Sequence, residues 1–178
     1  MQKMKATLIL ENGMTFAGRS IGSGEERICE MVFNTSMTGY QEILTDPSYA
    51  GQGIVMSYPL IGNYGVNHED NESSRPWAEA FIVRHLARRG SNFRCEDGLD
   101  SYLKQFHITG IEGVDTRALT RILRSQGTMN GMITCAEHFS VQECLERIRA
   151  YRVEGTVERV TRREPQMYPA LGERRLRV

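Results

Sequence analysis

The chain has 178 residues, with 22 basic and 22 acidic side chains, so its formal net charge is zero. This length suits one domain, or one domain with a tail, and no apolar run approaches the ~20 residues needed to cross a bilayer. The charge is uneven, because from Arg147 onward the chain has nine arginines and only four glutamates. A nucleic-acid-binding surface would interleave aromatic residues with such charges. We therefore interpret the tail as a solvated linker and expect neither a nucleic-acid nor a membrane partner.

Four cysteines, Cys29, Cys95, Cys135 and Cys144, are spread along the chain. None belongs to a CxxC pair, and their spacings match neither a disulfide framework nor a zinc site. The apolar stretch near the N-terminus is too short for a signal peptide and passes directly into a strand-and-turn pattern. We therefore expect a cytoplasmic protein without a metal site.

The first half of the chain predicts a series of short strands. Asn12-Gly13 is a favoured hairpin turn, because these residues tolerate the positive φ angles that the turn requires. The stretches 66–76 and 91–98 are polar and are predicted to be loops, the first of them exposed and acidic. The expected strands are Lys5 to Leu10, Thr15 to Arg19, Ile28 to Phe33, Gly53 to Tyr58 and Ala80 to Val83.

The second half alternates helices with strands. Asp115 and Ser140 are expected N-caps, and Gly127 is an expected C-terminal stop. Strands are expected over 108–114 and 129–134. Together these elements predict an α/β fold with a mixed sheet and helices covering one face. Apolar stripes at helical spacing are Leu99, Tyr102, Leu103 and Phe106; Ala118, Leu119, Ile122 and Leu123; and Val141, Cys144, Leu145 and Ile148.

After Tyr151 the regular pattern decays. Prolines interrupt any further element, and the terminal residues 174–178 look like the start of a new strand. We therefore place a boundary between a folded part, residues 1–151, and a linker, residues 152–178.

The segment from Asn34 to Tyr49 combines a turn, a short helix and a stop. Thr38 followed three residues later by Gln41 fits a capping box, and Ser36 is a second candidate cap. The helix would cover residues 39–44 and end before Pro47, which forces the preceding residue out of the helical region. Ser48 then lies on a polar loop between two apolar strands, where binding residues are often found. By its local pattern alone, however, the segment is better interpreted as a well-capped connector without a ligand.

No self-sufficient catalytic set is visible. Cys29 and Cys135 fall in expected strands and Cys144 on a helix stripe, where a buried thiol behaves as a small hydrophobe. Cys95 lies on a polar loop, but the acidic residues that follow it oppose a thiolate. The glycines fit neither a dinucleotide-binding loop nor a P-loop.

Two charged clusters are candidates for a binding role. His68, Glu69, Asp70 and Glu72 match neither an EF-hand loop nor a zinc motif, so a solvated loop is the better interpretation. A basic stripe on the second helix is either solvated or meets an acidic partner surface; it consists of Arg117, Arg121 and Arg124.

Several landmarks carry a family resemblance. FNTSMTGYQEILTDPSY at Phe33 to Tyr49 resembles the signature of the small, glutamine-hydrolysing subunit of carbamoyl-phosphate synthase, in its bacterial form. Other landmarks agree in order and spacing: LILENGMTFAGRSIG, SYPLIGNYGVN, SNFR and LDSYLKQFHITGIEGVDTRALTRILRSQGTMNGMI. The similarity extends from about Leu8 to Ile133.

The resemblance implies a fold and a domain organisation. The N-terminal domain of such subunits is a swivelling β/β/α domain in three layers, here residues 1–151. Residues 152–178 would lead toward a glutamine amidotransferase domain, whose Cys-His-Glu triad has no counterpart in this chain. The chain would therefore be an N-terminal fragment that is inactive by itself.

The resemblance also implies a site and partners. The serine of the DPSY motif, here Ser48, would contact bound glutamine, while this chain supplies no catalytic residue and no metal ligand. The domain would dock to the large subunit, which uses ATP and Mg²⁺ and receives the ammonia, to make carbamoyl phosphate for arginine or pyrimidine synthesis. An alternative is a stand-alone interaction module that has lost the amidotransferase domain, and the coding sequence after Val178 distinguishes the two.

Overall fold

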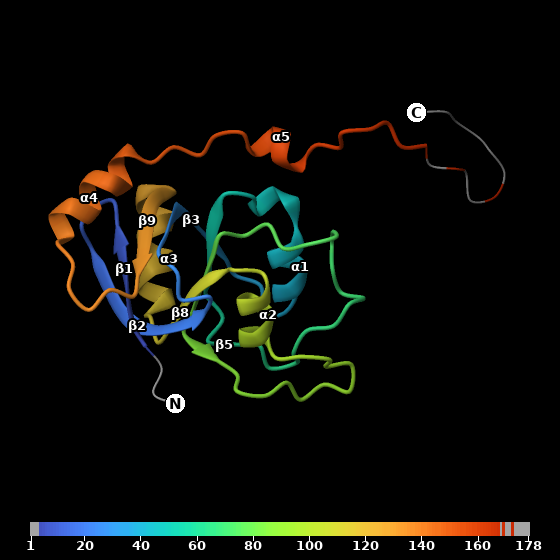
Figure 1. Ribbon diagram of the computed structural model, residues 1–178. Coiled ribbons are helices and arrows are strands. Elements are labelled where there is room, and N and C mark those ends of the chain that lie inside the picture. Colours follow the sequence, from blue (N-terminus) through green and yellow to red (C-terminus); the bar gives the residue numbers. More distant parts are fainter. Residues whose placement is uncertain (1–3, 168, 170–171, 173–178) are drawn as a thin grey trace.

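A closed sheet of seven strands forms the centre of the computed structural model, which describes residues 4–167, 169 and 172 (Figure 1). The order around the barrel is β1-β2-β8-β6-β4-β3-β9, and pairing of β9 with β1 closes it. A separate two-stranded sheet pairs β5 (Leu60–Ile61) with β7 (His85–Leu86). The barrel strands are β1 (Lys5–Leu10), β2 (Thr15–Gly22), β3 (Arg27–Asn34), β4 (Gln52–Met56), β6 (Ala80–Val83), β8 (Thr109–Glu112) and β9 (Met129–Thr134).

The sheet is mixed. Strands β3, β4, β6 and β8 pair in parallel with one another, whereas β1, β2 and β9 make antiparallel pairs. Parallel neighbours need a crossover connection. The crossover between β3 and β4 therefore carries the segment of the DPSY motif, and the crossover between β6 and β8 carries the loop at 91–98.

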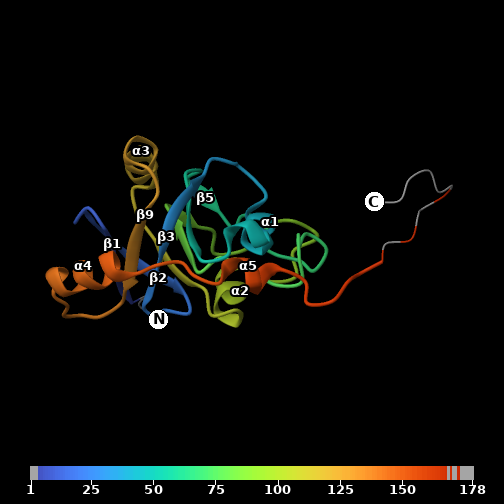
Figure 2. The same cartoon turned by 90° about the horizontal axis from the view of Figure 1, so that it is seen from above.

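Helices lie on opposite sides of the barrel. Figures 1 and 2 place α1 and α2 on one side and α4 on the other. Helix α3 packs Leu119 and Leu123 against the residues that fill the barrel. The helices are α1 (Tyr40–Thr45), the 3₁₀ turn η1 (Pro47–Tyr49), α2 (Leu99–Gln105), α3 (Thr116–Gln126), α4 (Val141–Ala150) and α5 (Thr156–Val160).

Apolar residues on both faces of the strands explain this arrangement. Successive side chains of a strand point to opposite faces, so Val55 joins the group inside the barrel while Ile54 joins the group beneath α1 and α2. Ile82 and Phe81 divide in the same way. Outside β1 and β9, Ile9 packs with the apolar stripe of α4. Strands that are apolar on both faces must be shielded from water on both. Here the inner face packs inside the closed barrel, and the outer face packs against the flanking helices.

The α/β class and the mixed sheet are confirmed, but two finer expectations are wrong. The sheet closes into a barrel rather than forming part of a three-layer sandwich, and helices cover more than one face. The physical reason is that β9 pairs with both β1 and β3, so neither strand is left as an open edge. Local patterns indicate strands but not their partners.

Element boundaries follow the prediction within a few residues, but the short elements β5, β7, η1 and α5 were not predicted. The caps at Asp115 and Ser140 and the stop at Gly127 are confirmed. Helix α5 was not predicted, because it is only one turn long and its Val157 is exposed rather than part of an apolar stripe. The strand expected at 174–178 lies outside the described residues, and the boundary after residue 151 stays a prediction. None of the helices in the described part of the chain has the length and apolar character needed to span a bilayer.

Candidate functional site

Ser48 lies in η1, the tight turn that follows α1. Asp46 leaves the helix with extended backbone, and Pro47 begins the turn, so the predicted stop is confirmed. Asp46 Oδ1 accepts a hydrogen bond from the backbone N–H of Ser48 at 2.8 Å, and Tyr49 N donates to Asp46 O at 3.1 Å. The Ser48 side chain is exposed, and within the described residues its hydroxyl has no hydrogen-bond partner. The backbone is therefore fixed while the hydroxyl remains available to a ligand.

The N-terminus of α1 is capped differently from the prediction. The N-cap residue is Gly39, in the left-handed region at φ 80°, and neither Ser36 nor Thr38 caps the helix. Instead the Tyr64 hydroxyl accepts hydrogen bonds from Gly39 N at 2.6 Å and from Tyr40 N at 3.2 Å. A phenol from a distant segment thus satisfies two N–H groups that the start of a helix leaves unpaired.

Tyr40 and Tyr64 hold their two segments together reciprocally. Their rings stack with centroids 4.2 Å apart, and the Tyr40 hydroxyl donates to Gly65 O at 2.5 Å. Burial raises the pKa of both phenols, so both stay protonated at neutral pH. The protonated Tyr40 hydroxyl keeps its donor hydrogen, which this contact requires.

Gln41 is the second side chain that the capping-box prediction misplaced. Its side chain is buried and points toward the loop at 66–76, called the acidic segment below, rather than back to the start of its own helix. Its Oε1 accepts from Asn67 N at 3.0 Å, and its Nε2 donates to Asn71 Oδ1 at 2.7 Å and to Asn67 O. All of its polar atoms are therefore used to fix the loop at 66–76.

The end of α1 is fixed by the same loop. The buried Thr45 hydroxyl donates to Gln41 O at 2.8 Å and accepts from Glu72 N at 2.9 Å. Thr45 O accepts from the Ser73 hydroxyl at 2.6 Å, and that hydroxyl accepts in turn from Trp77 Nε1 at 2.8 Å. Both ends of the helix that leads into η1 are thus bound to residues 64–77.

The acidic segment is consequently more ordered than a solvated loop. Arg94 pairs with Asp70 at 2.7 Å and Glu69 at 2.9 Å, and His68 Nδ1 lies 2.5 Å from Glu96 Oε1. Hydrogen bonds, first from the Asn67 side chain and then from Arg94, lower the pKa of Asp70. Among the residues described, no cluster of three or more His, Cys, Asp or Glu side chains could hold a metal ion.

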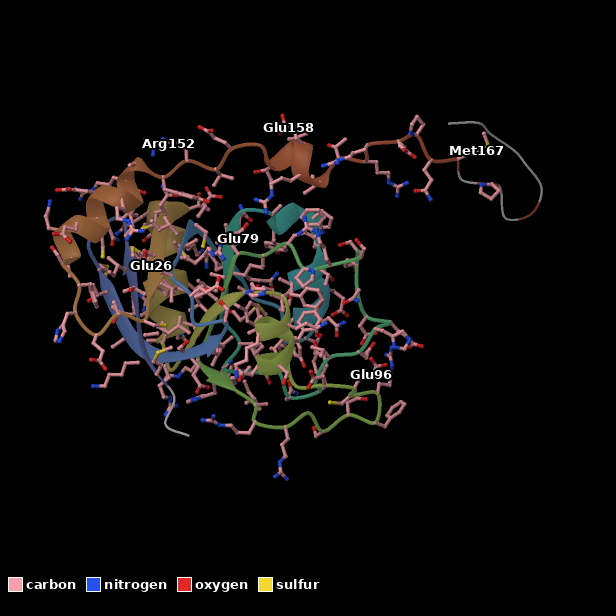
Figure 3. All side chains as sticks on the ribbon, in the orientation of Figure 1. Glu26, Glu79, Glu96, Arg152, Glu158 and Met167 are labelled. Atoms are coloured by element: carbon pink, nitrogen blue, oxygen red, sulfur yellow. The ribbon has the colours of Figure 1, made fainter. Side chains whose placement is uncertain are left out.

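Residues after α4 pass close to η1. A β-carbon at Gly51, which has φ +83°, would lie 2.9 Å from Val153 Cγ1. Farther along, Arg159 on α5 pairs with Glu79 at 2.9 Å, and Glu79 also pairs with Arg27 at 3.4 Å. Figure 3 shows this segment, through the labelled Arg152 and Glu158, along the side of the barrel where Glu79 lies. The segment therefore runs beside the turn that carries Ser48.

Cys29 and Cys144 are buried, whereas Cys135 is half-buried and lies just beyond β9 rather than in the strand expected for it. All four are free, and burial raises the pKa of the Cys29 and Cys144 thiols, which disfavours the nucleophilic thiolate. His107 lies at the surface with its Nδ1 3.1 Å from Glu25 Oε1. The structural interpretation of the buried Cys29 and Cys144 is therefore confirmed.

The basic stripe of α3 is exposed, and an acidic partner for it stays a prediction. A surface groove of about 390 Å³ begins beside it and is lined by Ser57, Pro59, Arg84, Asp115, Thr116 and Arg117. Ser57 follows the end of β4, whereas Gly51 near η1 precedes its start. The groove and Ser48 therefore lie toward opposite ends of that strand.

Sequence reasoning found Ser48 through the family landmark but missed the residues that position its turn. Tyr64, Gln41 and Thr45 act through contacts about 25 residues away along the chain. The local signal for them was their place in the landmarks: Gln41 and Thr45 lie in the first, FNTSMTGYQEILTDPSY, and Tyr64 lies in SYPLIGNYGVN.

Comparison with known proteins agrees with the landmarks. Residues 8–133 match the family model of the carbamoyl-phosphate synthase small chain, CPSase domain. The chain is 50% identical over 161 residues to the carbamoyl phosphate synthase small chain of Clostridium perfringens, covering 90% of this chain and 46% of that protein. It is 48% identical over 172 residues to the small chain of Bacillus caldolyticus, covering 96% and 47%.

Another relative has a more specific name, and its match covers the same shares of the two chains. The pyrimidine-specific small chain of Halalkalibacterium halodurans is 45% identical over 172 residues, which cover 96% of this chain and 47% of that protein. The chain thus spans about half the length of the curated relatives it matches. It belongs to the carbamoyl-phosphate synthase small chain family, and the part of that family it carries is the CPSase domain.

Proposed function

We propose that this chain is the N-terminal half of a glutamine-hydrolysing small chain of carbamoyl-phosphate synthase. It completes a glutamine pocket through Ser48 and docks to the large chain, where ammonia from glutamine is used to make carbamoyl phosphate. The observation that carries the proposal is the family match over residues 8–133, together with relatives that are about twice as long. The second half would supply the amidotransferase domain.

The geometry of the DPSY turn supports a role for Ser48. A hydroxyl both donates and accepts hydrogen bonds, which suits the ammonium and carboxylate groups of an amino acid. The Ser48 hydroxyl is exposed and unused by the described residues, while its backbone is held by Asp46. A ligand would therefore meet a group whose position is already fixed, which reduces the entropy lost on binding.

Under this proposal, glutamine hydrolysis and ATP-dependent synthesis take place in parts of the enzyme other than this chain. Hydrolysis of glutamine belongs to the amidotransferase domain, because the buried thiols here favour their protonated forms. ATP and Mg²⁺ belong to the large chain. The four free cysteines support a reducing, cytoplasmic location. Purified by itself, the chain should release no ammonia from glutamine.

Substitution of Ser48 tests the proposed site. In a small chain that joins these residues to an amidotransferase domain, Ser48→Ala should raise the KM for glutamine about fivefold through loss of one hydrogen bond. Ser36→Ala is the matched control, because Ser36 lies in the same segment with an exposed hydroxyl that no described residue binds. An unchanged KM in Ser48→Ala would remove Ser48 from the site.

A further inference from the structure

Phe93 is the most exposed large apolar side chain in the described part of the protein. It is 96% exposed, compared with 87% for Met167 and 71% for Val157. It lies in the connection between β7 and α2, at the centre of the SNFR landmark. An apolar side chain that is so fully solvated contributes nothing to the core. The presence of a phenylalanine at this exposed position therefore needs an explanation other than stability.

The backbone on both sides of Phe93 is firmly held. Before it, the backbone N–H and the hydroxyl of Ser91 both donate to Asn63 O, at 2.9 and 3.0 Å. Immediately around it, Arg94 N donates to the Asn92 side chain at 2.8 Å and Cys95 N to Asn92 O at 3.0 Å. The tip of the loop is therefore a closed turn.

The residues after Phe93 are anchored to the acidic segment. Glu96 N donates to Val66 O at 2.9 Å, and Val66 N donates to Asp97 O at 3.0 Å. The Arg94 guanidinium points back to Asp70, 2.7 Å away. The backbone that carries Phe93 is thus held in place, which lowers the entropy cost of using this residue in an interface.

Cys95 completes this support by packing between two glycines. Its sulfur lies so close to Gly65 and Gly90 that a β-carbon at either position would overlap it. Gly65 is also the residue whose carbonyl accepts from Tyr40. Close packing of this kind leaves the loop little freedom to fold Phe93 back onto the barrel.

The Phe93 loop lies away from the segment that follows α4. In Figure 3 the labelled Glu96, three residues after Phe93, lies at the opposite side of the body from Arg152 and Glu158. Figure 1 shows the same separation between the 91–98 connection and α5. Under the proposed function the amidotransferase domain follows α5 and approaches Ser48. The surface around Phe93 then remains open to a different protein.

A charged residue close to Phe93 in the sequence indicates the character of that protein. Arg94 pairs with Glu69 and Asp70 of the acidic segment, but the exposed Arg89, four residues before Phe93, pairs with no residue in the described part of the chain. Arginine and aromatic residues are enriched where interfaces derive most of their binding energy. A pocket that accepts Phe93 and carries acidic residues at its rim would complement both side chains.

We propose that Phe93 is an anchor by which this domain docks to the large chain of carbamoyl-phosphate synthase, inserting into an apolar pocket with an acidic rim that Arg89 meets. The inference rests on the proposed function, and it adds the docking surface and its central residue. The closed SNFR turn presents the ring, and the acidic segment fixes that turn relative to the barrel.

The test measures binding of the purified chain to the large chain from the same organism by titration calorimetry. Phe93→Asp should weaken binding at least about 30-fold, as for the central residue of an interface, and Phe93→Leu should weaken it less. Arg89→Glu should weaken binding more at low salt than at high salt. Val157→Asp is the matched control, because it places the same charge on an exposed apolar residue of α5.

The outcomes separate the two proposals. If the unchanged chain does not bind the large chain, the docking role in the proposed function fails. If it binds and Phe93→Asp binds equally well, the proposed function stands and the Phe93 anchor is wrong. Equal losses in Phe93→Asp and Val157→Asp would also overturn it. Because the Phe93 ring is almost fully solvated, the thermal unfolding midpoints of all these variants should match, which excludes misfolding.

Discussion

Ser48 and Phe93 are both exposed and both held in place, but by different kinds of contact. The backbone at Ser48 is fixed mainly from within its own turn, by Asp46 two residues earlier. The turn at Phe93 is also closed locally, by Asn92, but its flanks are fixed in addition by residues far along the chain, including Asn63 and Val66. One position offers an unused hydroxyl and the other an unused apolar ring, so each suits a different ligand.

A single segment, residues 63–70, supports both positions. Tyr64 and Asn67 contact α1, which leads into the Ser48 turn. Val66 and Asp70, from the same segment, contact the residues that follow Phe93. The two exposed positions therefore share a scaffold although they lie on different crossovers of the barrel. Substitutions that detach α1 from this scaffold should therefore affect both positions, whereas substitutions that remove a single cap or a contact within one turn should affect only one.

Gln41→Leu should have the largest effect, because it removes the hydrogen bonds that join the Gln41 side chain to Asn67 and Asn71. The leucine keeps similar volume but leaves part-buried backbone and amide groups unpaired, which should lower the free energy of unfolding by about 2–3 kcal/mol. Urea denaturation of the chain measures this loss. Hydrogen exchange should accelerate at the backbone N–H groups of both Ser48 and Glu96.

The matched control is Gln142→Leu on α4, whose exposed side chain has no partner among the described residues. It should change the free energy of unfolding by less than about 0.5 kcal/mol. If Gln41→Leu accelerated exchange at Ser48 and left Glu96 unchanged, the idea of a shared scaffold would be wrong.

Tyr64→Phe should have an intermediate effect confined to the α1 side. It keeps the stacked ring but removes the hydroxyl that caps Gly39 and Tyr40, which should cost about 1 kcal/mol of stability. Exchange should accelerate at the Gly39 and Tyr40 N–H groups and stay unchanged at Glu96. Tyr58→Phe is the control, since no described residue binds the Tyr58 hydroxyl.

The pH dependence of the free energy of unfolding provides a second test of Tyr64→Phe. Burial raises the pKa of Tyr64 in the folded chain, so above the ordinary value near 10 the unfolded chain loses its proton first. Stability contributed by this group is complete below pH 10 and is lost as pH rises toward the folded-state pKa. Tyr64→Phe should make the decline in stability above pH 10 shallower. An identical decline in both proteins would contradict the assigned environment of Tyr64.

The sequence predicted best those features whose partners lie nearby in the chain. The caps at Asp115 and Ser140 bond residues three positions later, and the stop at Gly127 bonds a residue four positions earlier. The barrel was missed because its closure depends on pairs such as Leu8 with Ile133, from opposite ends of the sequence. Periodicity indicates that a strand is buried on both faces but not which strand lies beside it.

The same distinction applies to the candidate site. The stop at Pro47 and the place of Ser48 beyond it followed from local chemistry and a family landmark, and the role of Ser48 stays a prediction. The Thr38 capping box was wrong because two distant residues compete for its atoms. Tyr64 supplies the cap, and Asn67 engages the Gln41 side chain. A local motif fails where tertiary partners satisfy the same groups.

Asp46→Ala should have the smallest effect, because it removes one hydrogen bond within the exposed turn of Ser48. The loss of the acceptor for Ser48 N should lower the free energy of unfolding by only about 0.5 kcal/mol. Asp46→Asn keeps an oxygen in the same place and serves as the matched control. In Asp46→Ala, exchange should accelerate at the Ser48 N–H and remain unchanged at Glu96, and affinity for the large chain should not change. If Ser48 exchange stayed slow in Asp46→Ala, the turn would be held by its distant contacts after all, and the contrast between a locally fixed Ser48 and a remotely fixed Phe93 would disappear.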